Sequence, residues 1–304
     1  MECETCGSEA VISTNNGVLC SRHFRKRFEE TTLDTIRRYR LIEKGETVAV
    51  ANSGGKDSLS LLYVLSKHFK DSNKIISITI DEGIKGYRDK TIAIMKDYCR
   101  KYNVGYKVYS YKDFTGKTMD SITGMIKGIP CATCGVLRRY LINYAASDIK
   151  ADKVATAHNM DDEAENIIMN LVQNDIEKMI RLGASSGVIK DEGFVPRIKP
   201  FLFLSEKETM LFSMLNGINA IHTPCPYAGL GFRGLISRKI KKMETQFSGS
   251  KRALVDSMLD IKERRGSSST LKMNRCGQCG FPSSTDVCEA CKLKQKLTPK
   301  TGIA

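Results

Sequence analysis

One short stretch of the sequence combines residue types that together can bind phosphate. Residues 53–58 read Ser-Gly-Gly-Lys-Asp-Ser and follow five mostly apolar residues, which is typical of a turn between a buried strand and a helix. Glycines let the backbone approach a ligand closely, and successive amides at the start of a helix favour an anion. Lys56 adds a cation for phosphate, and Asp57 adds a carboxylate for Mg²⁺. A phosphate-binding turn is predicted; the alternative is a plain strand-to-helix turn without a ligand.

The turn does not match the Walker A motif of other phosphate-binding loops. That motif requires glycine at position 50 and serine or threonine at position 57. The chain has Val50 and Asp57 at these positions. Walker A is therefore excluded for this turn.

Both ends of the chain carry cysteines at the spacing of structural zinc sites. A C-x2-C turn places two thiolates at about the separation of adjacent corners of a tetrahedron, and a second turn completes the four-coordinate site. Free thiols or redox-active C-x-x-C pairs are the alternatives. The sequence predicts one zinc ion at Cys3, Cys6, Cys20 and His23, and a second at Cys276, Cys279, Cys288 and Cys291.

Three of the four remaining cysteines lie where chemistry is favoured over packing. Cys131 and Cys134 form a C-x2-C pair just before an expected helix, and Cys225 lies between two prolines. If these thiolates held a 4Fe–4S cluster, one iron would stay open to sulfide or substrate. A disulfide or persulfide relay and ordinary buried cysteines are the alternatives on spacing alone. Cys99 lies in an amphipathic stretch and is expected in the core.

Between the terminal modules, strand-like and helix-like segments alternate. Strands are expected at residues 47–51, 74–81, 106–111 and 153–159, and helices at residues 59–69, 90–103, 134–149 and 161–173. This alternation predicts an α/β fold: a parallel sheet wrapped by helices, with chemistry at the carboxyl ends of its strands.

The charge of the chain suggests a polyanionic partner. The 304 residues carry a formal net charge of +14, and residues 224–304 hold 16 Lys and Arg against 6 Asp and Glu. A solubilising tail is the alternative. No apolar run approaches the roughly 20 residues of a membrane span, and the first residues lack the pattern of a signal peptide. A cytosolic (cytoplasmic) protein with no membrane partner is expected.

Composition and motifs together suggest four parts. These are an N-terminal zinc module at residues 1–28, a catalytic domain at residues 29–230, a basic helical segment at residues 231–272 and a C-terminal zinc module at residues 273–304. Residues 266–270, Gly-Ser-Ser-Ser-Thr, fit a short linker.

The turn at residues 53–58 resembles the PP-loop of ATP pyrophosphatases, which cleave ATP between the α and β phosphates and activate a carbonyl oxygen by adenylation. The resemblance implies the Rossmann-like fold of that family. It implies that pyrophosphate is held by Ser53, Gly54, Gly55, Lys56, Asp57 and Ser58, with Asp57 positioning Mg²⁺ or phosphate. Ala51 and Asn52 would lie beside the α-phosphate, and Ile80 and Asp81 would flank adenine and ribose.

Further motifs extend the resemblance over nearly the whole chain. The PP-loop, "PCATCGVLRRY", "AHNMDDEAENIIMN", "TPCPYAGLGFRG" and the terminal zinc modules occur in the same order as in the TtuA and NcsA group of tRNA 2-thiouridine synthetases. In that group the three central cysteines bind a 4Fe–4S cluster beside the ATP site. Carried over, these catalytic cysteines are Cys131, Cys134 and Cys225. A cysteine persulfide is the alternative sulfur carrier.

The stretch His158-Asn159-x-Asp161 resembles the group's second nucleotide motif. It implies that His158 lies beside the nucleotide and that Asp161 is a second catalytic carboxylate. An N-cap role alone would also explain Asp161, and Asp162 and Glu165 fit a solvated helix face equally well.

The resemblance implies a reaction in which ATP adenylates the C2 carbonyl oxygen of a tRNA uridine and sulfur then replaces that oxygen. Lys56 would offset the charge that develops on the phosphates. Arg138 and Arg139 are candidate contacts for ATP phosphate or tRNA, with surface charge as the alternative. Residues 232–244 and the distal zinc module would follow the RNA backbone. "CGVLRR" and "FRG" favour the anticodon wobble uridine over the T-loop uridine.

Partners and rival functions follow from the same resemblance. The sulfur donor could be free sulfide, a thiocarboxylated ubiquitin-like protein or a desulfurase persulfide, and a homodimer is usual in the group. A PP-loop enzyme of the tRNA 2-thiocytidine type is one rival, although terminal zinc modules are a feature of the thiouridine group. A non-enzymatic, zinc-bearing RNA-binding protein is the other.

Overall fold

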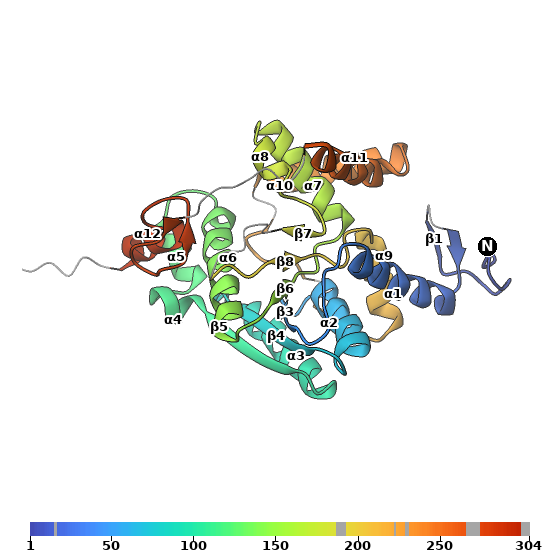
Figure 1. The fold of residues 1–304 in the computed structure, drawn as a ribbon, viewed down its shortest axis with the longest axis horizontal. Helices are drawn as coiled ribbons and strands as arrows, with labels where there is room; N and C mark the ends of the chain where they lie inside the picture. Colours follow the sequence, from blue (N-terminus) through green and yellow to red (C-terminus); the bar gives the residue numbers. More distant parts are fainter. Residues whose placement is uncertain (15–16, 187–192, 222, 229–230, 266–273, 299–304) are drawn as a thin grey trace, which may run out of the picture.

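The protein is built around a six-stranded sheet with the strand order β5-β4-β3-β6-β8-β7 (Figure 1). The structure, a computed structural model, describes residues 1–14, 17–186, 193–221, 223–228, 231–265 and 274–298. Neighbouring strands are parallel except β7, which is antiparallel to β8. The strands are β3 (Thr47–Ala51), β4 (Lys74–Asp81), β5 (Gly105–Ser110), β6 (Lys153–Ala155), β7 (Ser185–Ser186) and β8 (Arg197–Ile198). The predicted α/β fold with a parallel sheet is confirmed.

The central strand β3 fixes where the loops meet. Its middle residues Val48, Ala49 and Val50 are fully buried, because β3 is paired on both sides and covered on both faces. Since β4, β3 and β6 are parallel neighbours, their carboxyl ends lie at the same edge of the sheet. The segments that follow these three strands are therefore brought together.

Helices cover both faces of the sheet. Helix α6 (Pro130–Asp148) packs against β4 and β5 on one face, and α2 (Lys56–Phe69) and α9 (Glu206–Leu215) lie on the other (Figure 1). Helix α3 (Arg88–Lys101) also contacts β4 and β5, and α1 (Ser21–Arg38) packs on α9. Phe28 of α1 stacks on Phe212 of α9 with ring centroids 3.9 Å apart. The expected division at residue 28 thus falls inside a helix that belongs to the main core.

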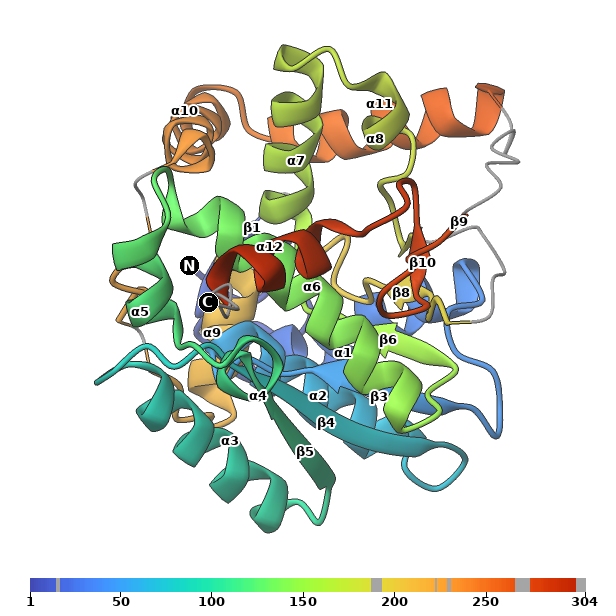
Figure 2. The same cartoon turned by 90° about the vertical axis from the view of Figure 1, so that its left-hand side faces the viewer.

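A second helical layer lies beyond the carboxyl edge of the sheet. Helix α7 (Met160–Val172) follows β6 and contacts α10 (Phe232–Gln246), α11 (Ser250–Arg265) and the short α8 (Ile176–Met179), as Figure 2 shows. Helices α10 and α11 occupy most of the predicted basic segment, and its expected linker at residues 266–270 lies outside the described residues. None of the helices that the structure describes is long and apolar enough to cross a bilayer.

The terminal modules lie at opposite ends of the molecule in Figure 1. The N-terminal module contains β1 (Ile12–Thr14) and β2 (Gly17–Leu19) and leads directly into α1. The C-terminal module contains β9 (Asn274–Arg275), β10 (Pro282–Ser283) and α12 (Glu289–Leu297). Helix α12 packs on α6 and on α4 (Tyr111–Thr115), which precedes α5 (Met119–Met125).

Several expected boundaries are corrected by the structure. Helix α2 begins at Lys56, three residues before the expected start, with Gly55 as its N-cap. Helix α6 begins at Pro130, so Cys131 and Cys134 lie inside the helix and not before it. Strand β6 ends at Ala155, well before the expected residue 159.

Candidate active site

The turn after β3 has a shape that only glycine allows at one position. Gly54 has a φ of +77°, and a Cβ atom there would lie 2.2 Å from the carbonyl oxygen of Thr91. The Asn52 side chain holds the turn closed, because its Oδ1 accepts hydrogen bonds from Gly54 N at 2.9 Å and from Ser58 Oγ at 3.0 Å. The amides of the turn thus precede the start of α2 in a fixed backbone conformation, as an anion-binding turn requires.

Two buried polar atoms of this turn have no hydrogen-bond partner among the described residues: Asp57 Oδ1 and Asn52 Nδ2. Asp57 Oδ2 accepts a hydrogen bond from Lys56 Nζ at 2.7 Å, and Lys56 also lies 3.8 Å from Glu206 Oε1. A buried carboxylate oxygen without a partner is costly unless a ligand completes it. Asp57 Oδ1 therefore fits a Mg²⁺ ion, and Asn52 Nδ2 fits a phosphate or ribose oxygen.

A cavity of about 370 Å³ opens beside the turn, at the carboxyl ends of β3, β4 and β6. Eight of the predicted nucleotide-site residues line this nucleotide cavity: Ala51, Asn52, Ser53, Asp57, Ser58, Ile80, Arg138 and His158. Gly54, Gly55 and Lys56 belong to the adjoining turn and helix start. Asp81 does not line the cavity; its Oδ1 accepts a hydrogen bond from Gly83 N at 2.8 Å and shapes the end of β4.

An ionic network that the sequence did not predict connects the nucleotide turn to a cysteine. Buried Arg88 donates hydrogen bonds to the carbonyl oxygens of Ser53 and Ile80. Its Nε lies 2.5 Å from Glu82 Oε2, and Arg138 Nε lies 2.9 Å from Glu82 Oε1. Arg138 Nη2 in turn lies 3.4 Å from Cys134 Sγ. The only sequence signal was an acidic residue directly after a buried strand.

The three central cysteines line one further cavity of about 800 Å³, here called the cysteine cavity. Cys225 lines both this cavity and the nucleotide cavity, as Arg138 and His158 do. The Cys131 thiol donates to Tyr227 O at 3.2 Å. The Tyr111 hydroxyl lies 3.2 Å from Cys134 Sγ. Three thiols on the wall of one cavity are compatible with a cluster of several metals.

Asp161 is held away from the nucleotide cavity by its own partners. It forms an ion pair with Lys251 and accepts a hydrogen bond from Glu206 N at 2.8 Å. It lines neither of the two cavities. The catalytic role of Asp161 stays a prediction, and any contact with the nucleotide would require exchange of these partners.

The N-cap of α7 is Asn159 and not Asp161, which corrects one alternative. Asn159 and Asp162 form a reciprocal capping box, so Asp162 is not on a solvated face. Glu165 is buried and pairs with Arg233 at 3.0 Å, which excludes a solvated face for it as well. Burial removes water from both side chains, and this raises the pKa of the Asp162 and Glu165 carboxyl groups.

His158 is neutral at neutral pH. Although His158 is exposed at the cavity wall, local loss of water, with the positive charges of Lys199 and Arg233, lowers the pKa of His158 below its ordinary value. Its Nδ1 lies 3.0 Å from Thr156 Oγ1. A neutral imidazole at the wall shared by the two cavities can accept or donate a hydrogen bond without adding charge.

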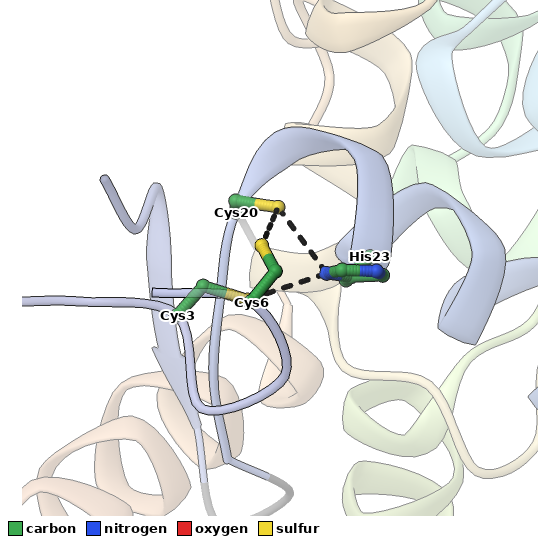
Figure 3. A group of neighbouring side chains, drawn as sticks. All are labelled: Cys3, Cys6, Cys20 and His23. Carbon is green, nitrogen blue, oxygen red and sulfur yellow. Dashed lines mark hydrogen bonds between the residues drawn. The ribbon is translucent and has the colours of Figure 1, made fainter. Parts of the chain in front are cut away.

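Both terminal modules bring four metal-binding groups together. Cys3, Cys6, Cys20 and His23 converge at the N-terminal module (Figure 3), and Cys276, Cys279, Cys288 and Cys291 converge at the C-terminal one, with ligand atoms within 4.8 Å of one another. Burial acts to raise the pKa of the Cys3 thiol. Hydrogen bonds outweigh this effect, the backbone N–H of Cys20 first among them, and the pKa is lowered to about 5. Four thiolate or imidazole groups without an open position fit structural zinc.

Comparisons with known proteins agree over most of the chain. The PP-loop domain family matches residues 21–219. The cytoplasmic tRNA 2-thiolation protein 1 of Arabidopsis thaliana is 36% identical over 94% of this chain and 81% of its own length. The tRNA 2-thiolation protein NcsA of Haloferax volcanii is 32% identical over 98% of this chain and 99% of its own length.

One solved structure is similar over the whole fold. It is the U34-tRNA thiolase NcsA from Methanococcus maripaludis with its 4Fe–4S cluster. The TM-score is 0.83 at 32% identity, and the match covers 98% of this chain and 96% of the other. The Rossmann-like PP-loop architecture is therefore shared over nearly the whole length of both chains.

Proposed function

The chain belongs to the PP-loop domain family and, within it, to the tRNA 2-thiolation proteins, and on this premise we propose that it is an ATP-dependent tRNA uridine 2-thiolase. The observation that carries the proposal is the shared wall of two cavities. The nucleotide turn opens into one cavity, the three central cysteines line the other, and Cys225 and Arg138 border both. One base atom can therefore be reached from both sides.

ATP is the substrate of the first half of the reaction. Its phosphates would lie on the turn at residues 53–58, with Lys56 opposite their negative charge and Asp57 Oδ1 on Mg²⁺. The C2 carbonyl oxygen of the uridine attacks the α-phosphorus, and pyrophosphate leaves. The oxygen is then bonded to AMP and has become a leaving group. Sulfur at the oxidation level of sulfide then bonds to C2, the C2–O bond breaks, AMP departs with that oxygen, and 2-thiouridine remains.

The three central cysteines fit an iron–sulfur cluster by their chemistry. Cys131, Cys134 and Cys225 offer three thiols on one cavity wall, and Tyr111 and Arg138 lie beside Cys134. A 4Fe–4S cluster held by three thiolates would supply an iron that can carry sulfide. Arg138 would place a positive charge beside the cluster, because its Nη2 lies 3.4 Å from Cys134 Sγ.

The remaining assignments extend the proposal to partners and substrate. The wobble uridine is favoured over the T-loop uridine, because the similar solved thiolase is named for U34. Two zinc ions, one at each terminal module, a homodimer, and sulfide or a thiocarboxylated ubiquitin-like protein as donor are part of the proposal. The name of the plant relative supports a cytoplasmic location.

The test is a reconstituted reaction on unmodified tRNA with ATP, Mg²⁺ and sulfide, carried out anaerobically. Asp57→Ala is expected to abolish thiolation while tRNA binding persists, because the buried oxygen that fits Mg²⁺ is lost. Asp97→Ala on the outer face of α3 is the matched control, since Asp97 is exposed. Mass spectrometry of the product, mapped by position, identifies the uridine.

Three outcomes would contradict the proposal or a part of it. Unchanged thiolation by Asp57→Ala would exclude the PP-loop as the site of activation. Full activity with two zinc ions per chain and no iron or sulfide would remove the cluster and leave a cysteine persulfide as the carrier. Thiolation of cytidine would identify the 2-thiocytidine type instead.

A further inference from the structure

The cysteine cavity is lined by positive charge alone. Seven of its lining residues are lysine or arginine, and no aspartate or glutamate of the described part of the chain lines it. These residues are Arg138, Arg139, Lys178, Arg181, Arg197, Lys199 and Arg233. Asn166 and Asn170 add amide groups to the same wall. A cavity of this kind concentrates anions.

Four of the seven cations already have a carboxylate partner. The pairs are Arg138 with Glu82, Lys178 with Asp175, Lys199 with Glu163, and Arg233 with Glu165. The Lys199 pair is the most deeply buried and is further fixed by a hydrogen bond from Gly183 N to Glu163. These four residues therefore have structural neighbours that account for their charge.

The remaining three cations of the cavity are Arg139, Arg181 and Arg197. Within the residues that the structure describes, no carboxylate lies within ion-pair distance of Arg139, Arg181 or Arg197. Arg197 of β8 donates from Nη2 to the carbonyl oxygen of Arg139 in α6 at 3.0 Å, so these two arginines are neighbours. Cations on one cavity wall that have no carboxylate partner among the described residues are an incomplete arrangement that an anion would complete.

The electrostatics of the two neighbours agree with this geometry. Although Arg139 is exposed, local loss of water, with the charge of Arg138, lowers the pKa of Arg139. Burial, with the charge of Arg139, lowers the pKa of Arg197 to about 10. Both stay protonated at neutral pH, and the charge of Arg139 disfavours the charge of Arg197. A bound anion would relieve this repulsion.

We propose that Arg139, Arg181 and Arg197 form a phosphate subsite that holds the RNA backbone next to the reacting uridine. The proposal rests on the proposed function and adds to it the residues that position the RNA. Phosphodiester groups fit because the planar guanidinium fork matches a phosphate, and because several separate cations suit successive phosphates along a strand. The same cavity holds the cysteines, so an RNA held here presents its base at the sulfur site.

The test measures RNA binding and its dependence on salt. The probe is a fluorescein-labelled anticodon stem-loop RNA with an unmodified wobble uridine, titrated by anisotropy with the full chain carrying its metals. Arg139→Gln and Arg197→Gln are each expected to make the negative slope of log affinity against log salt shallower by about 0.7. This corresponds to about fivefold weaker binding at 0.1 M salt. Arg197→Lys, which keeps the charge, is expected to keep the slope.

Arg100→Gln is the control for loss of one positive charge, because Arg100 is exposed on α3 and does not line the cavity. It is expected to leave slope and affinity unchanged, and ATP binding is expected to be normal in all variants. If Arg139→Gln and Arg197→Gln behave like Arg100→Gln, the subsite is refuted even where the wild type thiolates uridine.

A second outcome separates RNA from another anionic partner. If the glutamine variants bind RNA normally and lose thiolation only with a thiocarboxylated protein donor, not with sulfide, the cavity receives the donor's carboxyl terminus and the RNA subsite is overturned. If the wild type binds RNA with the expected slope and never thiolates it, the subsite stands and the proposed function fails.

Discussion

Replacing Glu82 by glutamine tests whether the nucleotide turn and the cysteine site are joined by charge. The Glu82 side chain is only 5% exposed and lies between two arginines, with Oε2 at 2.5 Å from Arg88 Nε and Oε1 at 2.9 Å from Arg138 Nε. Glutamine keeps the shape of the side chain and one accepting oxygen, and it removes the negative charge. The change therefore isolates the ionic part of the contact.

The expected loss of stability follows from the burial of Arg88. Its side chain is 4% exposed, so water does not replace the missing counter-charge. Removing one partner of a buried ion pair costs about 3–5 kcal/mol. The lower end, about 3 kcal/mol, is expected here because the amide oxygen still accepts one hydrogen bond and Arg88 keeps its bonds to Ile80 O and Ser53 O. Arg138 is half exposed and adds at most about 1 kcal/mol.

Urea denaturation and ATP titration measure the two consequences. The free energy of unfolding is expected to fall by the amount above, and ATP affinity is expected to fall with it, because Arg88 holds the carbonyl of Ser53 in the turn. Glu30→Gln is the control: Glu30 pairs with Lys26 at 3.7 Å with both side chains exposed, and its loss should cost less than about 1 kcal/mol. Equal losses for the two variants, with unchanged ATP binding, would refute the reasoning.

Three further predictions concern the turn, the shared histidine and the distal module. Gly54→Ala should abolish ATP binding measured by calorimetry, because its Cβ would lie 2.2 Å from Thr91 O, and wild-type affinity would contradict this. The lowered pKa of His158 means that the neutral ring contributes to stability above about pH 6.5 and that this contribution is lost as the pH falls below that value. NMR should show an inflection for His158 below about pH 6.5, and an inflection at or above 6.5 would argue against it. Cys279→Ser should remove one zinc ion per chain. It should also raise hydrogen exchange in α6, because the C-terminal module packs on α6 through Phe281 against Tyr140. Metal analysis that still finds two zinc ions per chain would count against this prediction.

Strands with a continuous apolar run could be predicted from the sequence, together with the residues at which they begin and end. Strands β3 and β4 have the expected bounds, because each apolar run ends at a polar turn that follows the sheet edge. The start of α6 was not found, although Pro130 is a residue type favoured in the first helical turn. The C-x2-C pair dominated the interpretation of that stretch, and a pair at this spacing is as compatible with a helical turn as with a loop.

The partners of charged residues could not be predicted, because they lie far apart in the sequence. Glu163 and Lys199 form a nearly inaccessible ion pair across 36 positions, and Asp161 meets Lys251 across 90. A charged residue at the start of a helix is compatible with a cap, a solvated face or a site. Only the fold decides between these, since the three-dimensional partner and not the residue type sets the role.

The position of Lys56 shows which contact a nucleotide can replace. Its ammonium lies 2.7 Å from Asp57 Oδ2 and 3.8 Å from Glu206 Oε1. The longer contact is the weaker one, and Glu206 keeps a closer partner in Lys241 at 2.8 Å. A phosphate can therefore take the place of Glu206 beside Lys56 without leaving that carboxylate uncompensated. Glu206 N also donates to Asp161 Oδ2 at 2.8 Å, so the predicted catalytic carboxylate is one hydrogen bond away from the residue whose place beside Lys56 a phosphate would take.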